Sequence, residues 1–506
     1  MPSRPFRSTR APLRALLLSL LALAAGAGAC SRGAERPDGA RHILLVVIDT
    51  LRADHLSCYG HWRETSPHID ALARRGVRFE QAIAGSSWTS PSMIGMLTGQ
   101  RVSRRRFDLP EEVPTLAELF LDAGYRTGAW VSNPLLKQEN GFRRGFQRWV
   151  RDSLREVDEV VEWLHARRAE DTFTWVHFTD PHDPYKPPRE RRGKTAGRLR
   201  PGQAELLREA AAECEEPKDY APQREFILRQ VGLYDDEVVE VDRKLGRLLA
   251  QLEEDGNLER AVVVVTADHG ECLWQRRESA AVVAHRRRTS GEPTRLEHVL
   301  KQTHGSQLHQ ELVRVPLVVA APGLAPGGVE EGVAGLVNLA PTILDLAGIE
   351  VDGREAMVGA SLFGEGAEAG AYAMTNQAET FVAADGWKLI LPTAEGRDPY
   401  GHVLQLYDLG TDPGELENLA DEHPERVEAL RRRIEERRRS ALPLPKAGSW
   451  EEQTRANAEA LRALGYADAG IVDLEEGPGP PASPPSPEKG AGGGAARAER
   501  GPGDGL

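Results

Sequence analysis

The chain has 506 residues, a hydrophobic content of 40% and a formal net charge of -13 at pH 7. This composition is typical of a globular protein with a sizeable core, and the length alone would suit about three domains of ~150 residues. The acidic balance excludes a protein that binds nucleic acid through its overall electrostatic field. Specific motifs therefore have to carry the functional argument.

The N-terminus has the pattern of an export signal, in which four arginines precede the apolar run ALLLSLLALAAGAGA. At about 15 residues the run is too short to span a bilayer comfortably. It ends at Cys30 in AGAC, and small residues directly before a cysteine resemble the cleavage box of bacterial lipoproteins. We expect a signal peptide over 1–29, lipidation of Cys30 and a tether over 30–40. An ordinary cleaved signal with an incidental cysteine is the alternative.

The expected lipid places the protein outside the bacterial cytoplasm, in the periplasm or on the outer membrane. The remaining cysteines are Cys58, Cys214 and Cys272. They are widely spaced and form no CxxC pair, so they indicate neither a zinc knuckle nor a disulfide framework. One disulfide among them and buried thiols both stay open.

Short apolar runs rich in β-branched residues alternate with segments of helical period. The runs suit strands that are buried on both faces, and several helical segments end in glycine, a common C-cap. The alternation predicts an α/β fold with a mostly parallel central sheet flanked by helices, over residues 41–350. The strands are expected at 42–49, 126–133, 172–180, 260–270 and 314–323, and the helices at 66–77, 113–125, 235–256 and 336–349.

A smaller α+β subdomain is expected over 351–470. Its strands lie in FVAADGWKLIL and VLQLYDLG, and its helices at 424–440 and 451–467. The Pro/Gly-rich tail over 471–506 cannot bury a core and is expected to be disordered. Segments 186–225 and 273–302 have no clean period, so we interpret them as insertions beside the cleft.

Acidic and histidine residues gather where the predicted strands end. Asp49 follows the first run, His182 and Asp180 follow the third, and Asp268 and His269 follow the fourth. Open α/β sheets bind ligands beyond the carboxyl ends of their strands, and an Asp/His set is what a divalent cation needs. A single strand-terminal Asp often only caps a helix. Three such ends in one sheet favour a metal site.

Thr89 lies in TSPSMIGMLTG, where Pro91 suits the first position of a helix. This places Thr89 just before a helix N-terminus, where backbone amides and the helix dipole favour an anion. A hydroxyl is a poor nucleophile alone, but a bound cation can activate it. The alternative is a threonine that only caps the helix.

The motifs resemble, in order, those of the sulfatase family of the alkaline phosphatase-like superfamily, over roughly residues 41 to 420. They include ILLVVIDTLRADHLSCYG, SPSMIGMLTG, HFTDPHDPYKPP, VVVVTADHGE and HGSQLHQELVRVPLVV. The resemblance implies one divalent metal ion (Ca, Mg, Mn or Zn) held by Asp49, Asp268, His269 and Thr89. Thr89 falls at the position of the family's nucleophile.

The resemblance also implies that His182 and His304 contact the anionic group or the leaving oxygen of the substrate. A loop histidine beside an insertion is the alternative for His304. We further expect Asn133, Asp180 and Arg101 to bind substrate.

Three departures from the family pattern bear on the chemistry. Sulfatases that cleave sulfate esters carry Cys or Ser at the nucleophile position, which is oxidised to formylglycine, whereas this chain has Thr89. Met93 stands where the signature has Arg, and Thr50 where a second carboxylate usually follows Asp49. Threonine nucleophiles do occur in phosphodiesterase-like relatives of the superfamily.

We therefore expect an exported, metal-dependent hydrolase of sulfate or phosphate esters, with phosphoester chemistry favoured and no formylglycine. Its substrate would be an anionic ester, such as a polysaccharide ester, a lipid head group or a small organophosphate. A catalytically inactive binding protein on the same fold is the alternative.

Overall fold

The structure is a computed structural model that describes residues 41–102, 106–152, 154–215, 220–278, 283–284, 287–288, 291, 293–300, 304–350, 354, 357–364, 369–393, 403–442 and 454–464. The expected signal peptide, the tether with Cys30 and the tail over 471–506 lie outside these residues. No helix in the described part is long and apolar enough to cross a membrane.

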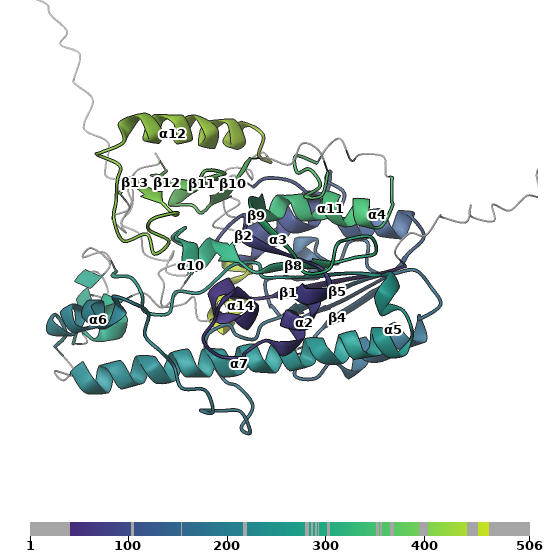
Figure 1. The fold of residues 1–506 in the computed structure, drawn as a ribbon, viewed down its shortest axis with the longest axis horizontal. Coiled ribbons are helices and arrows are strands. Elements are labelled where there is room, and N and C mark those ends of the chain that lie inside the picture. Colours follow the sequence, from purple (N-terminus) through teal and green to yellow (C-terminus); the bar gives the residue numbers. More distant parts are fainter. Residues whose placement is uncertain are drawn as a thin grey trace, which may run out of the picture.

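A nine-stranded sheet with helices on both faces forms the centre of the molecule, which confirms the predicted α/β class (Figure 1). The strand order is β4-β3-β5-β1-β6-β8-β2-β7, and β9 pairs with β2. The pairs among β4, β3, β5, β1 and β6 are all parallel. The strands are β1 His42–Ile48, β2 Val77–Ile83, β3 Arg126–Val131, β4 Arg148–Arg151, β5 Thr172–Phe178, β6 Ala261–Thr266, β7 Arg314–Val315, β8 Leu317–Ala320 and β9 Gly328–Gly335.

The inner strands β1, β5 and β6 are buried at every residue, as their continuous apolar runs predict. The structure has two strands in the segment 314–323, for which the sequence predicts one. Pro316 divides it into β7 and β8, because proline cannot donate to a ladder. Both pieces pair antiparallel with β2.

In Figure 1, α2, α5 and α7 lie on one side of the sheet, and α3, α4 and α11 on the other. The long helices are α2 Pro67–Arg75, α3 Thr89–Thr98, α4 Leu116–Asp122, α5 Asp158–Ala166, α6 Gln203–Ala212, α7 Tyr220–Glu254 and α11 Leu339–Leu346. Shorter turns of helix are η1 Ala53–His55, η2 Ser57–Tyr59, η3 Gln138–Asn140, η4 Leu258–Arg260, η5 Leu336–Asn338, α9 Leu296–Val299 and α10 Gln310–Val313.

Helix α7 is longer than the sequence pattern predicts. It begins at Tyr220 rather than Asp235 and has 35 residues. Its first residues, 220–225, belong to the segment 186–225 that we interpret from the sequence as an insertion. Ile227 and Val231 are nevertheless buried, and α7 packs against α6 from the same segment.

The C-terminal part forms a separate antiparallel sheet in the order β10-β11-β12-β13, covered by one helix (Figure 1). Its elements are β10 Gly370–Met374, β11 Ala378–Ala383, β12 Trp387–Pro392, β13 Gln405–Asp408 and α12 Pro424–Arg439. The backbone N–H of Met374 donates to the Gly85 carbonyl at 3.0 Å and joins the two sheets.

The last described element is α14 Ala458–Ala463. Leu461 and Leu464 pack in one apolar cluster with Trp88, Phe107 and Leu135. The C-terminal segment therefore covers the residue directly before Thr89. Elsewhere, Cys58, Cys214 and Cys272 are free thiols, so no disulfide joins them.

Candidate active site

Three neighbouring parallel strands deliver polar side chains to one edge of the large sheet. The order β5-β1-β6 places Asp49, after β1, between His177 at the end of β5 and Asp268 after β6. The three side chains are fully buried. Their ligand atoms all lie within 4.8 Å of one another, so they are close enough to share a single cation.

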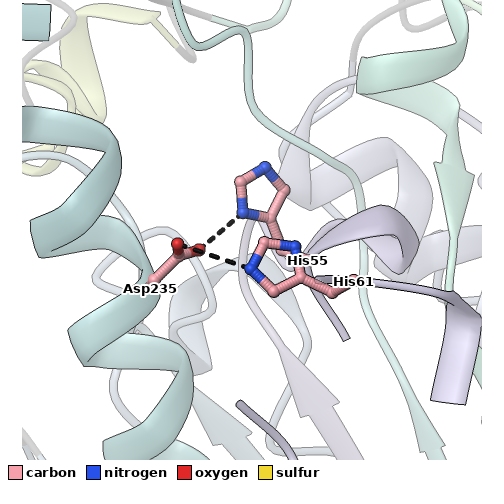
Figure 2. Close-up of side chains that lie close together, drawn as sticks. All are labelled: His55, His61 and Asp235. Atoms are coloured by element: carbon pink, nitrogen blue, oxygen red, sulfur yellow. Dashed lines mark hydrogen bonds and ion pairs between the residues drawn. The ribbon is translucent and has the colours of Figure 1, made fainter. Parts of the chain in front are cut away.

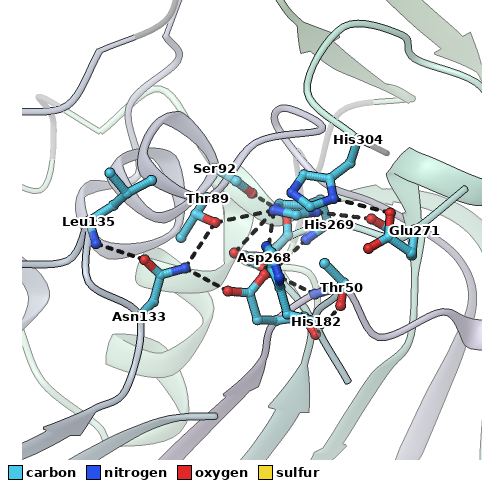
Figure 3. A network of polar contacts seen from close by, with 12 residues as sticks. Thr50, Thr89, Ser92, Asn133, Leu135, His182, Asp268, His269, Glu271 and His304 are labelled. Carbon is cyan, nitrogen blue, oxygen red and sulfur yellow. Dashed lines mark hydrogen bonds and ion pairs between the residues drawn. The ribbon is translucent and has the colours of Figure 1, made fainter. Parts of the chain in front are cut away.

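Thr89 is the first residue of α3, whereas the sequence placed it just before the helix with Pro91 at the first position. Its hydroxyl is fully buried and lies 3.2 Å from His269 Nε2. Asn133 Nδ2 lies 3.3 Å from the same oxygen (Figure 3). Ser92, one turn later in α3, donates to the Asp268 carbonyl at 2.5 Å. This bond ties the start of the helix to the end of β6.

The protonation state of His269 follows from its contacts. Its Nδ1 lies 3.0 Å from the Gly270 carbonyl, which only accepts, so Nδ1 carries the proton and Nε2 presents a lone pair to Thr89. Burial lowers the pKa of His269 to about 4. At neutral pH the ring is therefore neutral, as either a metal ligand or a proton acceptor must be.

Asp49 and Asp268 form a coupled acidic pair beside this ring. His269 Nε2 lies 3.6 Å from Asp49 Oδ1 and 3.5 Å from Asp268 Oδ2. Burial and the charge of Asp268 raise the pKa of Asp49. The pKa of Asp268 is lowered despite burial, because His269 and His177 stabilise its charge. Two buried carboxylates this close repel each other, so a cation bound between them would be favoured.

The polar atoms that lack partners test whether a cation fits here. Asp49 Oδ1, Asp268 Oδ2 and both ring nitrogens of His177 are buried without a hydrogen-bond partner among the described residues. Buried polar groups are nearly always satisfied, and carboxylate oxygen with imidazole nitrogen is a suitable donor set for a divalent ion. The residues present therefore fit a metal ion.

Sequence reasoning missed His177, because a lone histidine inside the apolar strand TFTWVHF is usually part of the core. The signal that could have found it is register: His177 pairs with Val47, two residues before Asp49.

Two further histidines, His304 and His182, lie beside His269 in the same cluster (Figure 3). The ring of His304 lies 4.3 Å from that of His269 and 4.9 Å from that of His182, measured between centroids. His182 Nδ1 contacts the Asp183 carbonyl at 2.5 Å. Burial alone would lower the pKa of His182, but the negative charges of Asp49 and Glu271 outweigh it and raise that pKa.

Glu271 is a second residue that sequence reasoning did not select. It is fully buried, its Oε1 lies 3.2 Å from His304 Nδ1, and burial raises its pKa to about 8. It lies two residues after His269 in ADHGE, and that position was the available signal.

Asn133 lies inside the cluster, with Nδ2 2.6 Å from Asp49 Oδ2 and Oδ1 accepting from the Leu135 N–H at 2.8 Å. The other two residues expected to bind substrate make contacts elsewhere. Asp180 pairs with Lys244 of α7 at 3.0 Å, and Arg101 donates to Ser440 Oγ at 2.9 Å.

Thr50 occupies the left-handed region with φ 58°, which is costly for a β-branched residue. Its N–H lies 3.4 Å from Asp268 Oδ1, and its carbonyl accepts from the Tyr234 hydroxyl at 2.8 Å. The strained turn directs the chain away from the sheet edge immediately after Asp49.

A family model described as Sulfatase matches residues 41–349, which is more than half of the chain. The chain belongs to the sulfatase family. As a sulfatase-family protein it is an ester hydrolase with an alkaline phosphatase-like fold, and this family is metal-dependent.

Relatives and solved structures of the family agree over most of the chain. "Uncharacterized sulfatase YidJ" of Escherichia coli (strain K12) is 23% identical over 443 residues, covering 75% of this chain and 83% of that protein. The choline-sulfatase of Rhizobium meliloti (strain 1021) is 23% identical and covers 76% and 83%. The phosphonate monoester hydrolase of Silicibacter pomeroyi has a TM-score of 0.59 at 21% identity and covers 79% and 96%.

Proposed function

We propose that this sulfatase-family hydrolase cleaves phosphate esters or diesters, with Thr89 Oγ1 as the nucleophile. The observation that carries the proposal is the position of that hydroxyl. It is buried at the N-terminus of α3, between His269 Nε2 and Asn133 Nδ2. A threonine that only capped the helix would have no reason to lie beside an unsatisfied acidic pair.

Asp49, Asp268 and His269 would hold one divalent cation, and His177 is a further donor beside them. A bound cation of this kind lowers the pKa of a neighbouring hydroxyl and neutralises charge that develops on the substrate. This set of carboxylate oxygens and imidazole nitrogens is compatible with Ca, Mg, Mn or Zn.

The chain's own groups have separate tasks in the proposed reaction. Asn133 Nδ2 donates to the Thr89 oxygen and to Asp49, so it orients the nucleophile. The amides at the start of α3 favour the anionic group of the substrate. His182, with its raised pKa, holds a proton that it can give to the leaving oxygen.

The chemistry of Thr89 argues against formylglycine. Its hydroxyl sits on a secondary carbon, so oxidation would give a ketone rather than an aldehyde. Structural neighbours named as phosphonate monoester hydrolases support phosphorus chemistry on this fold. Another structural neighbour was solved with its substrate D-glucosamine-2-N,6-O-disulfate (TM-score 0.60, 19% identical). The assay should therefore include both sulfate and phosphate esters.

The test is a turnover assay of three proteins: the wild type, Thr89→Ala, and Thr89→Ser, which keeps a hydroxyl. Each is given nitrophenyl sulfate, phosphate and phosphodiester in the presence of Ca, Mg, Mn or Zn. We expect phosphoester turnover that is retained in Thr89→Ser and abolished in Thr89→Ala. Sulfate turnover that is lost in Thr89→Ala would contradict the choice of ester. No turnover of any ester, together with no bound metal, would favour a non-catalytic binding protein.

We further propose that the enzyme is exported and anchored through Cys30, so that its substrates are extracytoplasmic. The support is the basic and apolar N-terminal pattern that ends in AGAC. Fractionation tests it: wild type is expected with the membranes, and Cys30→Ala in the soluble extracytoplasmic fraction. Equal distribution of both would contradict the anchor.

A further inference from the structure

A second cluster of metal-ligating side chains lies where the loop that follows β1 meets α7. His55 and His61 belong to that loop, and Asp235 belongs to α7. Figure 2 shows both rings directed at the Asp235 carboxylate. The three side chains are 6%, 7% and 0% exposed, respectively. None of them belongs to the candidate active site.

The two imidazole rings stack, with centroids 5.1 Å apart and an interplanar angle of 25°. Each ring uses one nitrogen to face a different oxygen of Asp235. His55 Nδ1 lies 2.6 Å from Oδ1, which is a strong hydrogen bond. His61 Nε2 lies 3.5 Å from Oδ2, and neither of these two buried atoms has a hydrogen-bond partner among the described residues.

The contact of the second His61 nitrogen, Nδ1, shows which ring nitrogen carries the proton. His61 Nδ1 lies 3.1 Å from the Asp54 carbonyl. A carbonyl oxygen only accepts, so Nδ1 is the protonated nitrogen, and in the neutral ring Nε2 has a lone pair. That lone pair faces a carboxylate oxygen. Two buried acceptors directed at each other are unfavourable unless a positive charge lies between them.

The arrangement has the features of a metal site. A metal-ligating histidine usually donates its other N–H to a carbonyl or carboxylate, as His61 does to Asp54. The ligand atoms of the three residues lie within 4.8 Å of one another. In a tetrahedral site, Zn–N and Zn–O bonds of about 2.0–2.2 Å place the ligand atoms about 3.4 Å apart. The 3.5 Å between His61 Nε2 and Asp235 Oδ2 already suits a shared ion, whereas His55 Nδ1 and Asp235 Oδ1, now 2.6 Å apart, would separate by about 0.8 Å on binding.

Solvent reaches the cluster through a cavity of about 770 Å³ that all three side chains line. The cavity offers an entry path for an ion and room for water at a remaining coordination position. Two histidines and one carboxylate are a borderline donor set that suits Zn²⁺ better than Ca²⁺ or Mg²⁺.

We propose that His55 Nδ1, His61 Nε2 and Asp235 form a zinc site, separate from the catalytic cluster, that clamps the loop after β1 to α7. For Nδ1 of the neutral His55 ring to bind the ion, its proton moves from Nδ1 to Nε2, so the ring stays neutral. The proposal is independent of the ester chemistry, so either can fail without the other.

Equilibrium dialysis of the chelator-stripped full chain against Zn²⁺, with bound zinc measured by mass spectrometry, tests the site. His61→Gln removes one ligand, and His68→Gln is the matched control. His68 Nδ1 pairs with Asp242, two turns further along α7, at 2.8 Å, but no second histidine accompanies it in the described structure. We expect His61→Gln to lose one zinc equivalent and His68→Gln to lose none.

The catalytic cluster can also bind zinc, so Asp49→Asn is measured alone and combined with His61→Gln. The two losses are expected to add. At the site that lacks His61, we expect the affinity for Zn²⁺ to fall by more than ~10–100-fold. That range is the loss in metal affinity when only a group hydrogen-bonded to a ligand is removed. An unchanged zinc content in His61→Gln would overturn the proposal and leave His61 as an imidazolium paired with Asp235.

A measurement on the wild type covers the case in which His61→Gln does not fold. Modification of His61 by diethylpyrocarbonate, mapped on peptides, is expected to slow when Zn²⁺ is present. Equal modification of His61 with and without Zn²⁺ would also overturn the proposal.

Discussion

Replacing Asn133 with aspartate isolates one hydrogen-bond donor in the candidate active site. Asn133 Oδ1 accepts from the Leu135 N–H at 2.8 Å, and an aspartate oxygen can keep that bond. The Nδ2 group, which lies 2.6 Å from Asp49 Oδ2 and 3.3 Å from Thr89 Oγ1, is replaced by an acceptor. The variant therefore loses the two donated bonds and adds a carboxylate beside Asp49.

The magnitude follows from these two bonds. A hydrogen bond to a charged group is worth about 1.5–3 kcal/mol, and removal of one donor that stabilises a developing oxyanion costs about 10²–10³ in kcat. We expect kcat of Asn133→Asp to fall by about 10² or more at saturating cation. The free energy of unfolding without metal should fall by about 1–3 kcal/mol at pH 7, because the new carboxylate repels a buried acidic pair.

Steady-state turnover and urea unfolding measure the two effects. Asn140→Asp is the control, since Asn140 also donates in this loop, to the Leu135 carbonyl at 3.0 Å and to Asn457 Oδ1 at 3.3 Å. It should lose stability but keep kcat within a few-fold. A kcat of Asn133→Asp within threefold of the wild type would refute the role of Asn133 at the nucleophile.

Three further predictions concern stability and reactivity. Lys388→Met should lower the free energy of unfolding in urea by about 1.5–3 kcal/mol, because the buried Glu415 loses the Lys388 ammonium at 2.6 Å and keeps Arg276 at 3.1 Å. The half-exposed Arg426→Met should lower it by under about 1 kcal/mol. Burial raises the pKa of Cys58 to about 12, so its reaction with Ellman's reagent at pH 8 should be far slower in the native protein than in urea, and equal rates would contradict this burial. Burial lowers the pKa of His42, so the folded state binds fewer protons than the unfolded state. The stability that neutral His42 contributes should be present at pH 7 and be lost as the pH falls below the unfolded pKa of about 6.5. The free energy of unfolding of His42→Gln should therefore decline less steeply between pH 7 and pH 5 than that of the wild type.

The sequence predicted the centre of the fold because its inner strands are buried on both faces. The runs that became β1 and β6 are almost continuously apolar, and the run that became β5 is β-branched or aromatic at every position except His177. Short runs of this composition favour strands that are buried on both faces. Since parallel strands share one carboxyl edge, Asp49, Asp268 and His269 were expected together, and the structure places them together. The strands β2, β4 and β9 were not predicted, because they are partly exposed and their patterns are mixed.

The site was harder to complete from the sequence, because the missing members depend on packing rather than on motifs. His177 resembles a core residue until the register of β5 against β1 is known. Arg101 and Asp180 follow promising motifs, yet their contacts with Ser440 and Lys244 depend on where the C-terminal segment and α7 pack. The His61–Asp235 contact joins residues 174 positions apart, at a distance that no local pattern encodes.

The most direct test of the central claim is whether Thr89 becomes covalently modified during turnover. The enzyme would be mixed with a nitrophenyl phosphoester, quenched in acid within one turnover, digested and analysed by high-resolution mass spectrometry, with Thr89→Ser as a second source of the adduct. The account predicts a phosphoryl ester on the peptide that contains Thr89, located at residue 89 in both proteins. Turnover without any adduct at residue 89, in an enzyme that Thr89→Ala leaves active, would contradict it.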